Sequence, residues 1–472
     1  MYASAGTHHG GGRPAVWIKA RPANQALVIE SDPARYFKPP CVGPSGWIGV
    51  WLDQRPPWSV IRSLLRFVPA RADFPSDQSA VQSSACVALC AIVARSLSSA
   101  RKTMASGPRR LITAVTYGAT CAALLMPAAS PAQTRPKSGA VTQPPAARRT
   151  VKLLLNSGPS GANAWLLLAD AAGYFRSEGI DLRVTNGRGA YTAANRMVHE
   201  SFDFGYGDIN ALVEEASIRP DSTPMGVFML FNRSPSAIIL KRNSPIVTAR
   251  QLEGKRIIGH ATDVALNTFD AFAERMRIDV RKITIIPDSS GFSGLIAALD
   301  DGRADAVFGY ITTSIAAVES SGANPDSTLR FLMYRDAVPE LYGSALMASR
   351  SLVNGDPALV RAFVRAANRG LIAAMNDPDA AISEVMKRDP TLRPEIERNR
   401  LLRTLRGDMG GAEGATLGIG DIDPKRFALA IRMMNAGDRM PRLPEWDTVF
   451  SRDFLPPLSE RVRTLADVTK KK

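Results

Sequence analysis

The stretch WLLLADAAGYFRSEGIDL, residues 165–182, decides the fold of this chain. Its apolar residues recur at helical spacing as far as Phe175, and Gly179 follows as a residue that tolerates the left-handed end of a helix. An apolar run at 151–155 predicts a buried strand before this helix, and alternation over 180–184 predicts a strand after it. A strand, a helix and a strand in this order form a βαβ unit with a right-handed crossover and a parallel sheet.

The rest of the chain beyond residue 150 continues as strands and helices in alternation. Strands are predicted at 202–205, 225–231, 256–259, 283–286, 306–308 and 329–333, with helices between most of them. Two further apolar runs, at 237–240 and 343–348, bracket the second set of these elements. Asp356-Pro357 is typical of a helix start, and the long helix after it places Leu359, Phe363 and Leu371 on one apolar face. The pattern predicts an α/β fold.

Three motifs of this region resemble one class of ABC-transporter proteins. They are AGYFRSEGIDL at 172–182, FDFGYG at 202–207 and LEGKRIIG at 252–259. They are similar to motifs of the periplasmic solute-binding proteins for sulfonates, taurine, nitrate and thiamine-precursor pyrimidines. The resemblance covers roughly residues 151–376 and says almost nothing about the ligand.

The resemblance implies a periplasmic-binding-protein fold of type II, with two doubly wound lobes joined by a two-strand hinge. Lobe one is expected at 151–234 and 344–472, and lobe two at 237–341. The runs at 237–240 and 343–348 are then the strands that cross between lobes. Such a hinge permits closure around a ligand.

The charge and the cysteines are concentrated before residue 150. The formal net charge is +15, but residues 1–150 hold 18 Lys and Arg against 5 Asp and Glu, whereas the rest holds 41 against 39. No basic patch with interleaved aromatics lies in the body, so we expect no nucleic-acid partner. All four cysteines also lie before residue 150, which excludes a disulfide or a cysteine nucleophile from the body.

The N-terminal third has the features of an export signal. A basic stretch follows Met104, residues 111–126 are apolar, and small residues at 127–132 offer a cleavage site. We therefore predict a signal peptide at 104–132, periplasmic localisation and a linker at 133–150. Residues 1–103 lack sustained periodicity and are predicted to be disordered or untranslated. The alternative is a retained signal-anchor helix, although about 16 apolar residues are few for a membrane span.

The body offers little for catalysis. Its two histidines, His199 and His260, are far apart in sequence, and two isolated histidines do not make a metal site. The sequence around Ser293 departs from the hydrolase nucleophile elbow, because Leu295 stands where the last glycine belongs. No GxGxxG or Walker A motif occurs. We therefore predict that the chain is not an enzyme and has no cofactor or metal.

Polar loops at strand ends that run into helix N-termini are the candidate ligand contacts, because they present free N–H groups and hydroxyls to a ligand. Trp165 is a candidate for stacking, with a core role as the alternative, and Tyr310 and Tyr342 end strands near the expected cleft. The alternative for each loop is a cap that only ends a helix. Arg233 is interpreted as a salt-bridged surface residue, and His260 as a possible ligand contact. The predicted ligand-binding residues are Ser157, Ser160, Asn163, Trp165, Tyr206, Asp208, Asn210, Thr262, Asp263, Ser289, Ser290, Tyr310 and Tyr342.

These features together predict the periplasmic substrate-binding component of an ABC importer. It would capture a small organic or inorganic solute by lobe closure and present it to the transmembrane permease subunits. The alternatives are a non-transport enzyme and a sensory ectodomain built on the same fold.

Overall fold

In the computed structural model, the described residues are 2–4, 15–19, 29, 34, 36–39, 47–51, 148–288, 292–438 and 440–463. The predicted signal peptide lies outside them, as does nearly all of the predicted linker. Before residue 148, β2 (Ala15–Lys19) pairs antiparallel with β4 (Trp47–Trp51), which also pairs with β3 (Tyr36–Phe37); β1 (Tyr2–Ser4) belongs to the same sheet. The structure thus describes strands where the sequence pattern predicted none.

The first of two sheets in the body has five strands in the order β6-β5-β7-β14-β8. Strand β5 pairs in parallel with β6 and β7, whereas β14 runs antiparallel to its neighbours β7 and β8. The strands are β5 (Arg149–Leu154), β6 (Ile180–Thr185), β7 (Phe204–Asp208), β8 (Met225–Met229) and β14 (Ser344–Ala348).

The second sheet repeats this arrangement in the order β11-β10-β12-β9-β13. Strand β10 pairs in parallel with β11 and β12, and β9 runs antiparallel to β12 and β13. The strands are β9 (Ser236–Lys241), β10 (Arg256–His260), β11 (Thr284–Asp288), β12 (Ala306–Tyr310) and β13 (Leu329–Met333). We refer to the halves built on the first and second sheets as the first and second lobes.

The chain passes between the lobes twice. The first crossing segment, residues 230–235, leads from β8 to β9, and the second, residues 334–343, leads back from β13 to β14. The amides of Leu230 and Phe231 both donate to the carbonyl of Ser344, and the amide of Gly343 donates to the carbonyl of Phe231. These hydrogen bonds place the two crossing segments beside one another. The apolar runs expected to cross between the lobes instead lie in the sheets, the first in β9 and the second in β14. The lobe boundaries drawn from the sequence stay predictions.

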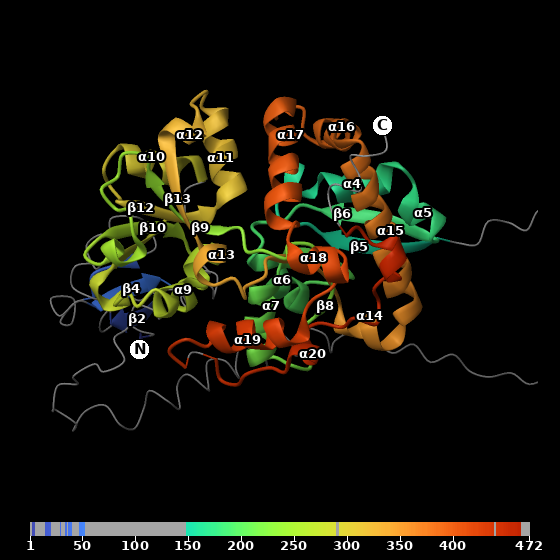
Figure 1. Ribbon diagram of the computed structural model, residues 1–472. Coiled ribbons are helices and arrows are strands. Elements are labelled where there is room, and N and C mark those ends of the chain that lie inside the picture. The colour runs from blue at the N-terminus through green and yellow to red at the C-terminus, as the bar shows by residue number, and fades with distance from the viewer. Residues whose placement is uncertain are drawn as a thin grey trace, which may run out of the picture. The chain divides into compact units, whose positions relative to one another are not determined.

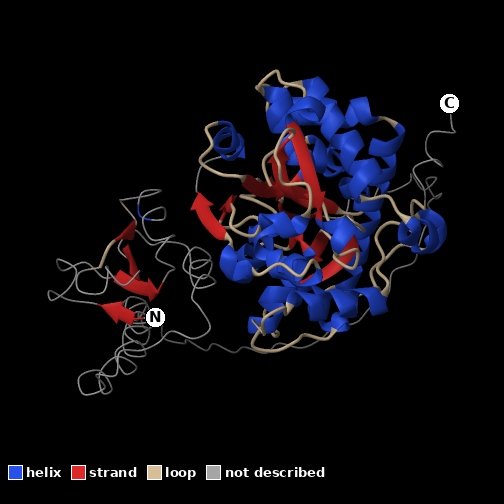
Figure 2. Ribbon diagram, turned by 60° about the vertical axis from the view of Figure 1, so that its left-hand side comes forward, coloured by secondary structure: helices blue, strands red, loops and turns tan. Residues whose placement is uncertain are grey.

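Helices surround the strands of the body (Figures 1 and 2). None of the helices in the described residues is long and apolar enough to cross a membrane. Those between β5 and β14 are α4 (Ala164–Ala171), α5 (Tyr174–Ser177), α6 (Thr192–His199), α7 (Ile209–Ile218), α8 (Val264–Asn267), α9 (Phe269–Arg275), α10 (Phe292–Asp300), α11 (Ile311–Ser320), α12 (Pro325–Thr328) and α13 (Tyr334–Ala337). Those after β14 are α14 (Arg350–Gly355), α15 (Pro357–Asn376), α16 (Pro378–Arg388), α17 (Pro394–Arg403), α18 (Ala412–Leu417), α19 (Pro424–Met434) and α20 (Trp446–Val449). Short single-turn helices complete the body: η2 (Gly161–Asn163), η3 (Ala249–Leu252), η4 (Val280–Lys282), η5 (Thr404–Asp408) and η6 (Leu458–Glu460).

Two predicted elements differ from those observed. The single helix expected from 165 to 175 is broken at Gly173, whose φ of 76° starts α5 in a left-handed conformation. The strand expected at 202–205 begins at Phe204 and continues to Asp208, so the expected loop at 206–210 is instead the end of β7 and the start of α7.

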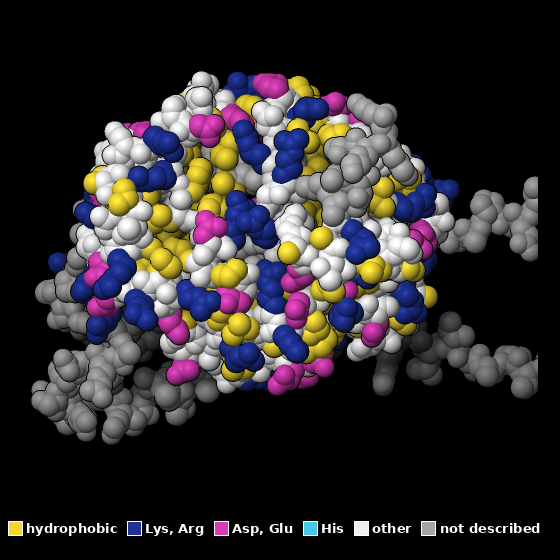
Figure 3. All heavy atoms as spheres, viewed as in Figure 1, with side chains coloured by type: hydrophobic (Ala, Val, Ile, Leu, Met, Phe, Trp, Pro, Cys, Tyr) yellow, Lys and Arg dark blue, Asp and Glu magenta, His cyan; other side chains and the backbone are white. Residues whose placement is uncertain are grey.

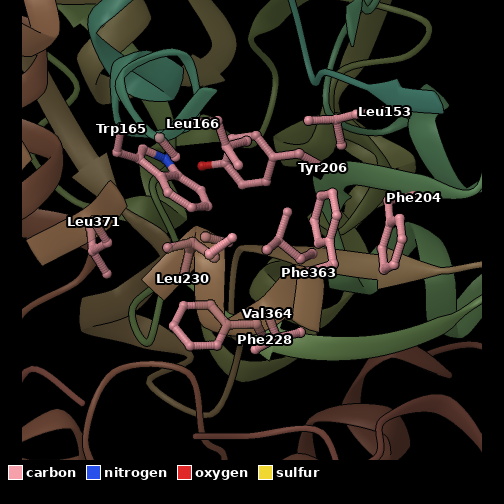
Figure 4. Packing of buried hydrophobic residues seen from close by; sticks show 14 of the residues in the cluster. Leu153, Trp165, Leu166, Phe204, Tyr206, Phe228, Leu230, Phe363, Val364 and Leu371 are labelled. Atoms are coloured by element: carbon pink, nitrogen blue, oxygen red, sulfur yellow. The ribbon is translucent and has the colours of Figure 1, made fainter. Parts of the chain in front are cut away.

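The aromatic core of the first lobe packs α4 and α15 against β7. The rings of Phe204 and Phe363 stack with centroids 3.7 Å apart, and Trp165 meets Tyr206 edge to face at 5.7 Å. All four side chains are buried. In Figure 4 the indole nitrogen of Trp165 and the hydroxyl of Tyr206 point toward one another. Burial of these rings holds α4 against β7, and α4 begins where the loop after β5 ends.

Gly370 lets α15 approach α4 closely, which gives a first testable prediction. A Cβ at this position would lie 2.3 Å from the Cβ of Ala169 and 2.7 Å from the carbonyl oxygen of Trp165. Gly370→Ala should therefore lower the free energy of unfolding by about 2 kcal/mol, because overpacking outweighs the better helix propensity of alanine. Chemical denaturation would measure it. The matched control is Gly355→Ala, where the new Cβ meets nothing within 4 Å; equal stability of the two variants would contradict the prediction.

Candidate functional site

A cavity of about 330 Å³ lies where the two lobes face each other. Residues at or after the carboxyl ends of β5, β6, β10 and β12 line it, together with one residue of α10, one of the first crossing segment and one of α17. This is where α/β sheets bind their ligands. The lining residues are Asn156, Ser157, Ala162, Arg188, Gly189, Ala190, Phe231, His260, Thr262, Asp263, Val264, Leu295, Tyr310, Thr312, Thr313 and Arg400.

The loop after β5 is held by Asn163, which is fully buried. Its Nδ2 donates to Oδ1 of Asn156 at 3.2 Å and to the carbonyl of Gly158 at 2.9 Å. Its Oδ1 accepts from the amide of Ser160 at 3.0 Å. Asn163 therefore fixes the loop that carries Asn156 and Ser157 without lining the cavity itself.

Arg400 of α17 brings a guanidinium to the cavity. Its side chain is only 16% exposed, and its Nη1 lies 3.8 Å from an oxygen of Glu397. Its Nη2 donates to Oγ1 of Thr313 in the second lobe at 3.0 Å, whereas its buried Nε has no partner. Burial lowers the pKa of Arg400, although Glu397 and Tyr206 act in the opposite direction. The arrangement leaves donor capacity on a largely desolvated cation, which favours an anionic group in the cavity. Arg188, an exposed residue after β6, adds a second guanidinium.

The second lobe contributes His260, Thr262 and Asp263. The hydroxyl of Thr262 and Nδ1 of His260 are 2.7 Å apart, and burial lowers the pKa of His260 although Asp288 opposes the shift. Asp263 caps α8 by accepting from the amides of Ala265 and Leu266 at 2.7 and 3.2 Å. Burial raises the pKa of Asp263 to about 6, with a further contribution from the charge of Asp208.

A hydrogen bond between Tyr310 and Asp208 joins the lobes at this cavity. The Tyr310 hydroxyl, at the end of β12, donates to Oδ2 of Asp208 at 2.7 Å. Asp208 is fully buried at the end of β7, and its Oδ1 accepts from the backbone and side-chain nitrogens of Asn210, both at 2.9 Å. Burial raises the pKa of Asp208 to about 6, although these hydrogen bonds oppose the shift. The carboxyl therefore lies beneath the cavity wall and does not line the cavity.

The structure separates the predicted site residues into groups. Four of them line the cavity: Ser157, Thr262, Asp263 and Tyr310. Six are buried behind its wall: Ser160, Asn163, Trp165, Tyr206, Asp208 and Asn210. Ser289 and Ser290 lie outside the described residues.

The placement predicted for Tyr342 and that for Arg233 need correction. Tyr342 does not line the cavity: it lies in the second crossing segment, and its hydroxyl donates to Glu413 at 2.8 Å. The guanidinium of Arg426 lies over its ring at 3.9 Å. Arg233 forms no salt bridge within the described residues, because the nearby Asp408 pairs with Arg335 instead.

Sequence reasoning missed several lining residues, most importantly Arg188, Thr312, Thr313 and Arg400. Arg188 lies between two glycines directly after a predicted strand, and Thr312 and Thr313 follow the predicted strand end at Tyr310. Those three could have been found by extending the rule that loops at strand ends bind ligands. Arg400 has no such signal, because a helix that starts 186 residues after the end of β7 brings it to the cavity.

No group of three or more His, Cys, Asp or Glu side chains in the described residues is arranged to hold a metal ion.

Comparison with known proteins gives both family and structural matches. Residues 162–381 match the family model described as "NMT1/THI5 like". The riboflavin-binding protein RibY of Chloroflexus aurantiacus is 24% identical over 276 residues, which cover 57% of this chain and 75% of that protein. The family resemblance predicted from the motifs is confirmed.

Two solved structures share the fold. The alkanesulfonate-binding protein SsuA from Xanthomonas axonopodis pv. citri bound to MOPS matches with a TM-score of 0.51 at 16% identity, covering 65% of this chain and 100% of that one. The periplasmic aliphatic sulphonate binding protein SsuA from Escherichia coli gives a TM-score of 0.51 at 15% identity, covering 65% and 94%. The predicted periplasmic-binding-protein fold is confirmed.

Proposed function

We propose that this chain, whose residues 162–381 match the NMT1/THI5-like family model, is the substrate-binding component of an ABC importer. It binds one small solute between its lobes, closes over it and presents it to the transmembrane permease subunits. The observation that carries the proposal is a cavity whose walls come from strand ends of both lobes and that Phe231 of the first crossing segment also lines. Closure around such a cavity buries a ligand without any covalent step.

Contacts between α17 and α11 support the closure. Glu397 of α17 accepts from the amide of Gly161 at 2.7 Å, which ties this helix to the first lobe. Arg403 of the same helix donates to Glu319 of α11 at 2.7 Å, and Arg393 donates to the backbone carbonyl of Ser320. The two helices lie side by side across the gap between the lobes (Figure 1). We refer to these contacts as the clasp, and they stabilise the closed arrangement.

The clasp gives a second testable prediction. Arg403→Ala should raise the Kd of the bound solute about twofold, because a partly exposed ion pair contributes about 0.5 kcal/mol to closure. Isothermal titration calorimetry would measure it. Arg388→Ala is the matched control, because Arg388 forms a similar ion pair with Asp170 inside the first lobe. Equal affinity of the two variants would count against the clasp.

The lining chemistry suits a small organic solute with an anionic or strongly hydrogen-bonding group. The guanidinium groups of Arg188 and Arg400 would contact that group, and the Thr312 and Thr313 hydroxyls add donors and acceptors. Phe231 and Leu295 offer apolar contact to the remainder. The riboflavin-binding relative and the sulfonate-binding structures make flavins and sulfonates the first compounds to test.

A thermal-shift screen tests the function. Riboflavin, sulfonates, nitrate, aromatic carboxylates and pyrimidines would each be added to the purified chain. A ligand present at 100 times its Kd should stabilise the folded state by about 2.7 kcal/mol. Stabilisation by one compound, reversed by dialysis, is the expected result, whereas no response to any small solute would contradict the proposal.

The proposal also includes export to the periplasm. It further includes that the chain binds its solute without enzymatic turnover. An enzyme on this fold is the alternative, and His260 beside Asp263 is the pair that would serve as acid and base. Recovery of the bound compound unchanged after prolonged incubation separates binding from turnover. Cleavage after the apolar segment at 111–126 would be established by N-terminal sequencing of the exported protein.

A further inference from the structure

A second cavity, of about 550 Å³, lies at the crossings between the lobes. Asn232 and Arg233 of the first crossing segment line it, as do Pro339 and Glu340 of the second. Arg335, also in the second crossing segment, lines it too, and the remaining lining residues are Gly411, Ala412, Glu413 and Arg426. Figure 3 shows Lys and Arg side chains gathered at the middle of its face, between the positions of α13 and α18 in Figure 1. None of the residues that line this cavity lines the first one.

Several polar atoms at the second cavity are buried without a partner. The Asn232 side chain is 1% exposed, and neither its Oδ1 nor its Nδ2 forms a hydrogen bond. Oε2 of Glu340 and Nε of Arg426 are also buried and without a partner. A buried polar group without a hydrogen bond costs about 1–3 kcal/mol. Three such side chains around one cavity indicate that something polar completes their hydrogen bonds.

The charges around the cavity are paired except for one. Arg426 pairs with Glu413 at 2.8 Å, Arg335 with Asp408 at 3.3 Å, and Glu340 with Arg275 at 2.6 Å. Among the charged lining residues in the described part of the chain, only Arg233 has a side chain without a hydrogen bond or an ion pair, and its backbone amide donates to the carbonyl of Asp408 at 3.1 Å. The Arg233 guanidinium therefore brings to the cavity a positive charge that acts on the nearby Asp408 only through space, which leaves its N–H donors for a singly charged anion.

We propose that this second cavity is a binding site for a small carboxylic acid that carries a hydroxyl or amino group beside its carboxylate. Arg233 and Nδ2 of Asn232 bind the carboxylate, and Nε of Arg426 is a further donor. Oδ1 of Asn232 and Oε2 of Glu340 accept from the neighbouring hydroxyl or amino group. The inference does not depend on the proposed transport function, because it uses none of the residues of the first cavity.

Calorimetric titration of the full chain with glycolate, glycine, acetate and ethanolamine tests the proposal. Saturable binding of glycolate or glycine is expected, with acetate at least tenfold weaker and ethanolamine without binding. Arg233→Met should weaken the binding at least tenfold. Arg183→Met is the matched control, because it removes a surface arginine of β6 that is 69% exposed, and it should leave the affinity unchanged. Circular dichroism would verify that both variants fold.

Binding of the acid at the second cavity can be tested separately from the proposed transport function. The same titration on Arg400→Met, in which the first cavity has lost its buried cation, should give unchanged affinity for the acid. Loss of binding in Arg400→Met with retention in Arg233→Met would overturn the proposal, since the acid would then occupy the first cavity. No saturable binding of either glycolate or glycine by the wild-type chain would also overturn it, and would indicate that water alone completes these hydrogen bonds.

Discussion

Replacing Arg400 with methionine is expected to raise the Kd of an anionic ligand about 100-fold, which corresponds to about 2.7 kcal/mol. Arg400 is a largely buried cation with donor capacity left over, and truncation of one partner of a desolvated charge pair costs about 2–5 kcal/mol. The variant also loses the hydrogen bond to Thr313 of the second lobe. Both losses act in the same direction, because one weakens the contact with the ligand and the other weakens closure.

The comparison that isolates this effect uses Arg398→Met on the same helix. Arg398 is 43% exposed and pairs with the exposed Asp379, so its replacement removes the same charge without touching the cavity. Calorimetry on both variants, with the ligand found by the screen, should show a loss only for Arg400→Met. A loss below threefold for Arg400→Met would mean that the ligand does not contact the guanidinium.

Asp208→Asn is expected to reduce the pH dependence of stability by up to about 3 kcal/mol. Burial raises the pKa of Asp208 from 3.8 to about 6, and each unit of pKa shift corresponds to about 1.4 kcal/mol. Because the folded-state pKa is the higher one, the native state binds the proton more tightly than the unfolded chain. Stability from this group is therefore present below pH 3.8 and is lost as the pH rises toward 6.

Urea denaturation of the wild type and of Asp208→Asn between pH 3.5 and 7.5 would measure this contribution, because that range spans the interval from the ordinary pKa of 3.8 to the folded-state pKa of about 6. Asparagine keeps the cap of α7, because its oxygen can still accept from the amide of Asn210. The raised pKa of Asp408 acts in both proteins, whereas Asp263 loses the contribution from the charge of Asp208, so the difference between the two curves reports Asp208 together with this smaller change at Asp263. Parallel curves would show that Asp208 titrates normally. Tyr310→Phe is a companion variant: it removes a hydrogen bond that lowers the pKa of Asp208, so it should move the decline toward higher pH.

The sequence predicted the elements of the fold well because hydrophobic periodicity reports local burial. The long helix after Asp356 illustrates this: Asp356 accepts from the amide of Leu359, and the predicted apolar face is buried in the first lobe. The bounds of β7 were misplaced because the segment 202–208, FDFGYGD, mixes apolar, acidic and glycine residues and has no periodicity that marks where the strand begins or ends. That shift placed Tyr206 and Asp208 in the strand, where both are buried, and not in a ligand-binding loop.

The candidate site was only partly predictable, because a cavity between lobes depends on distant segments. Ser157, Thr262, Asp263 and Tyr310 follow strands, and the rule for strand ends found them. The same rule could not distinguish side chains that face the cavity from Asn163, which supports the loop from behind. Arg400 comes from a helix packed against the loop after β5, and no local pattern indicates such a contact.

Native mass spectrometry of the purified chain, incubated with the ligand found by the screen, tests the central claim most directly. The account predicts a complex with one ligand per chain, release of the ligand chemically unchanged on unfolding, and loss of the complex in Arg400→Met but not in Arg398→Met. Chemical conversion of the ligand, or an equally populated complex in both variants, would contradict a solute held reversibly between the two lobes.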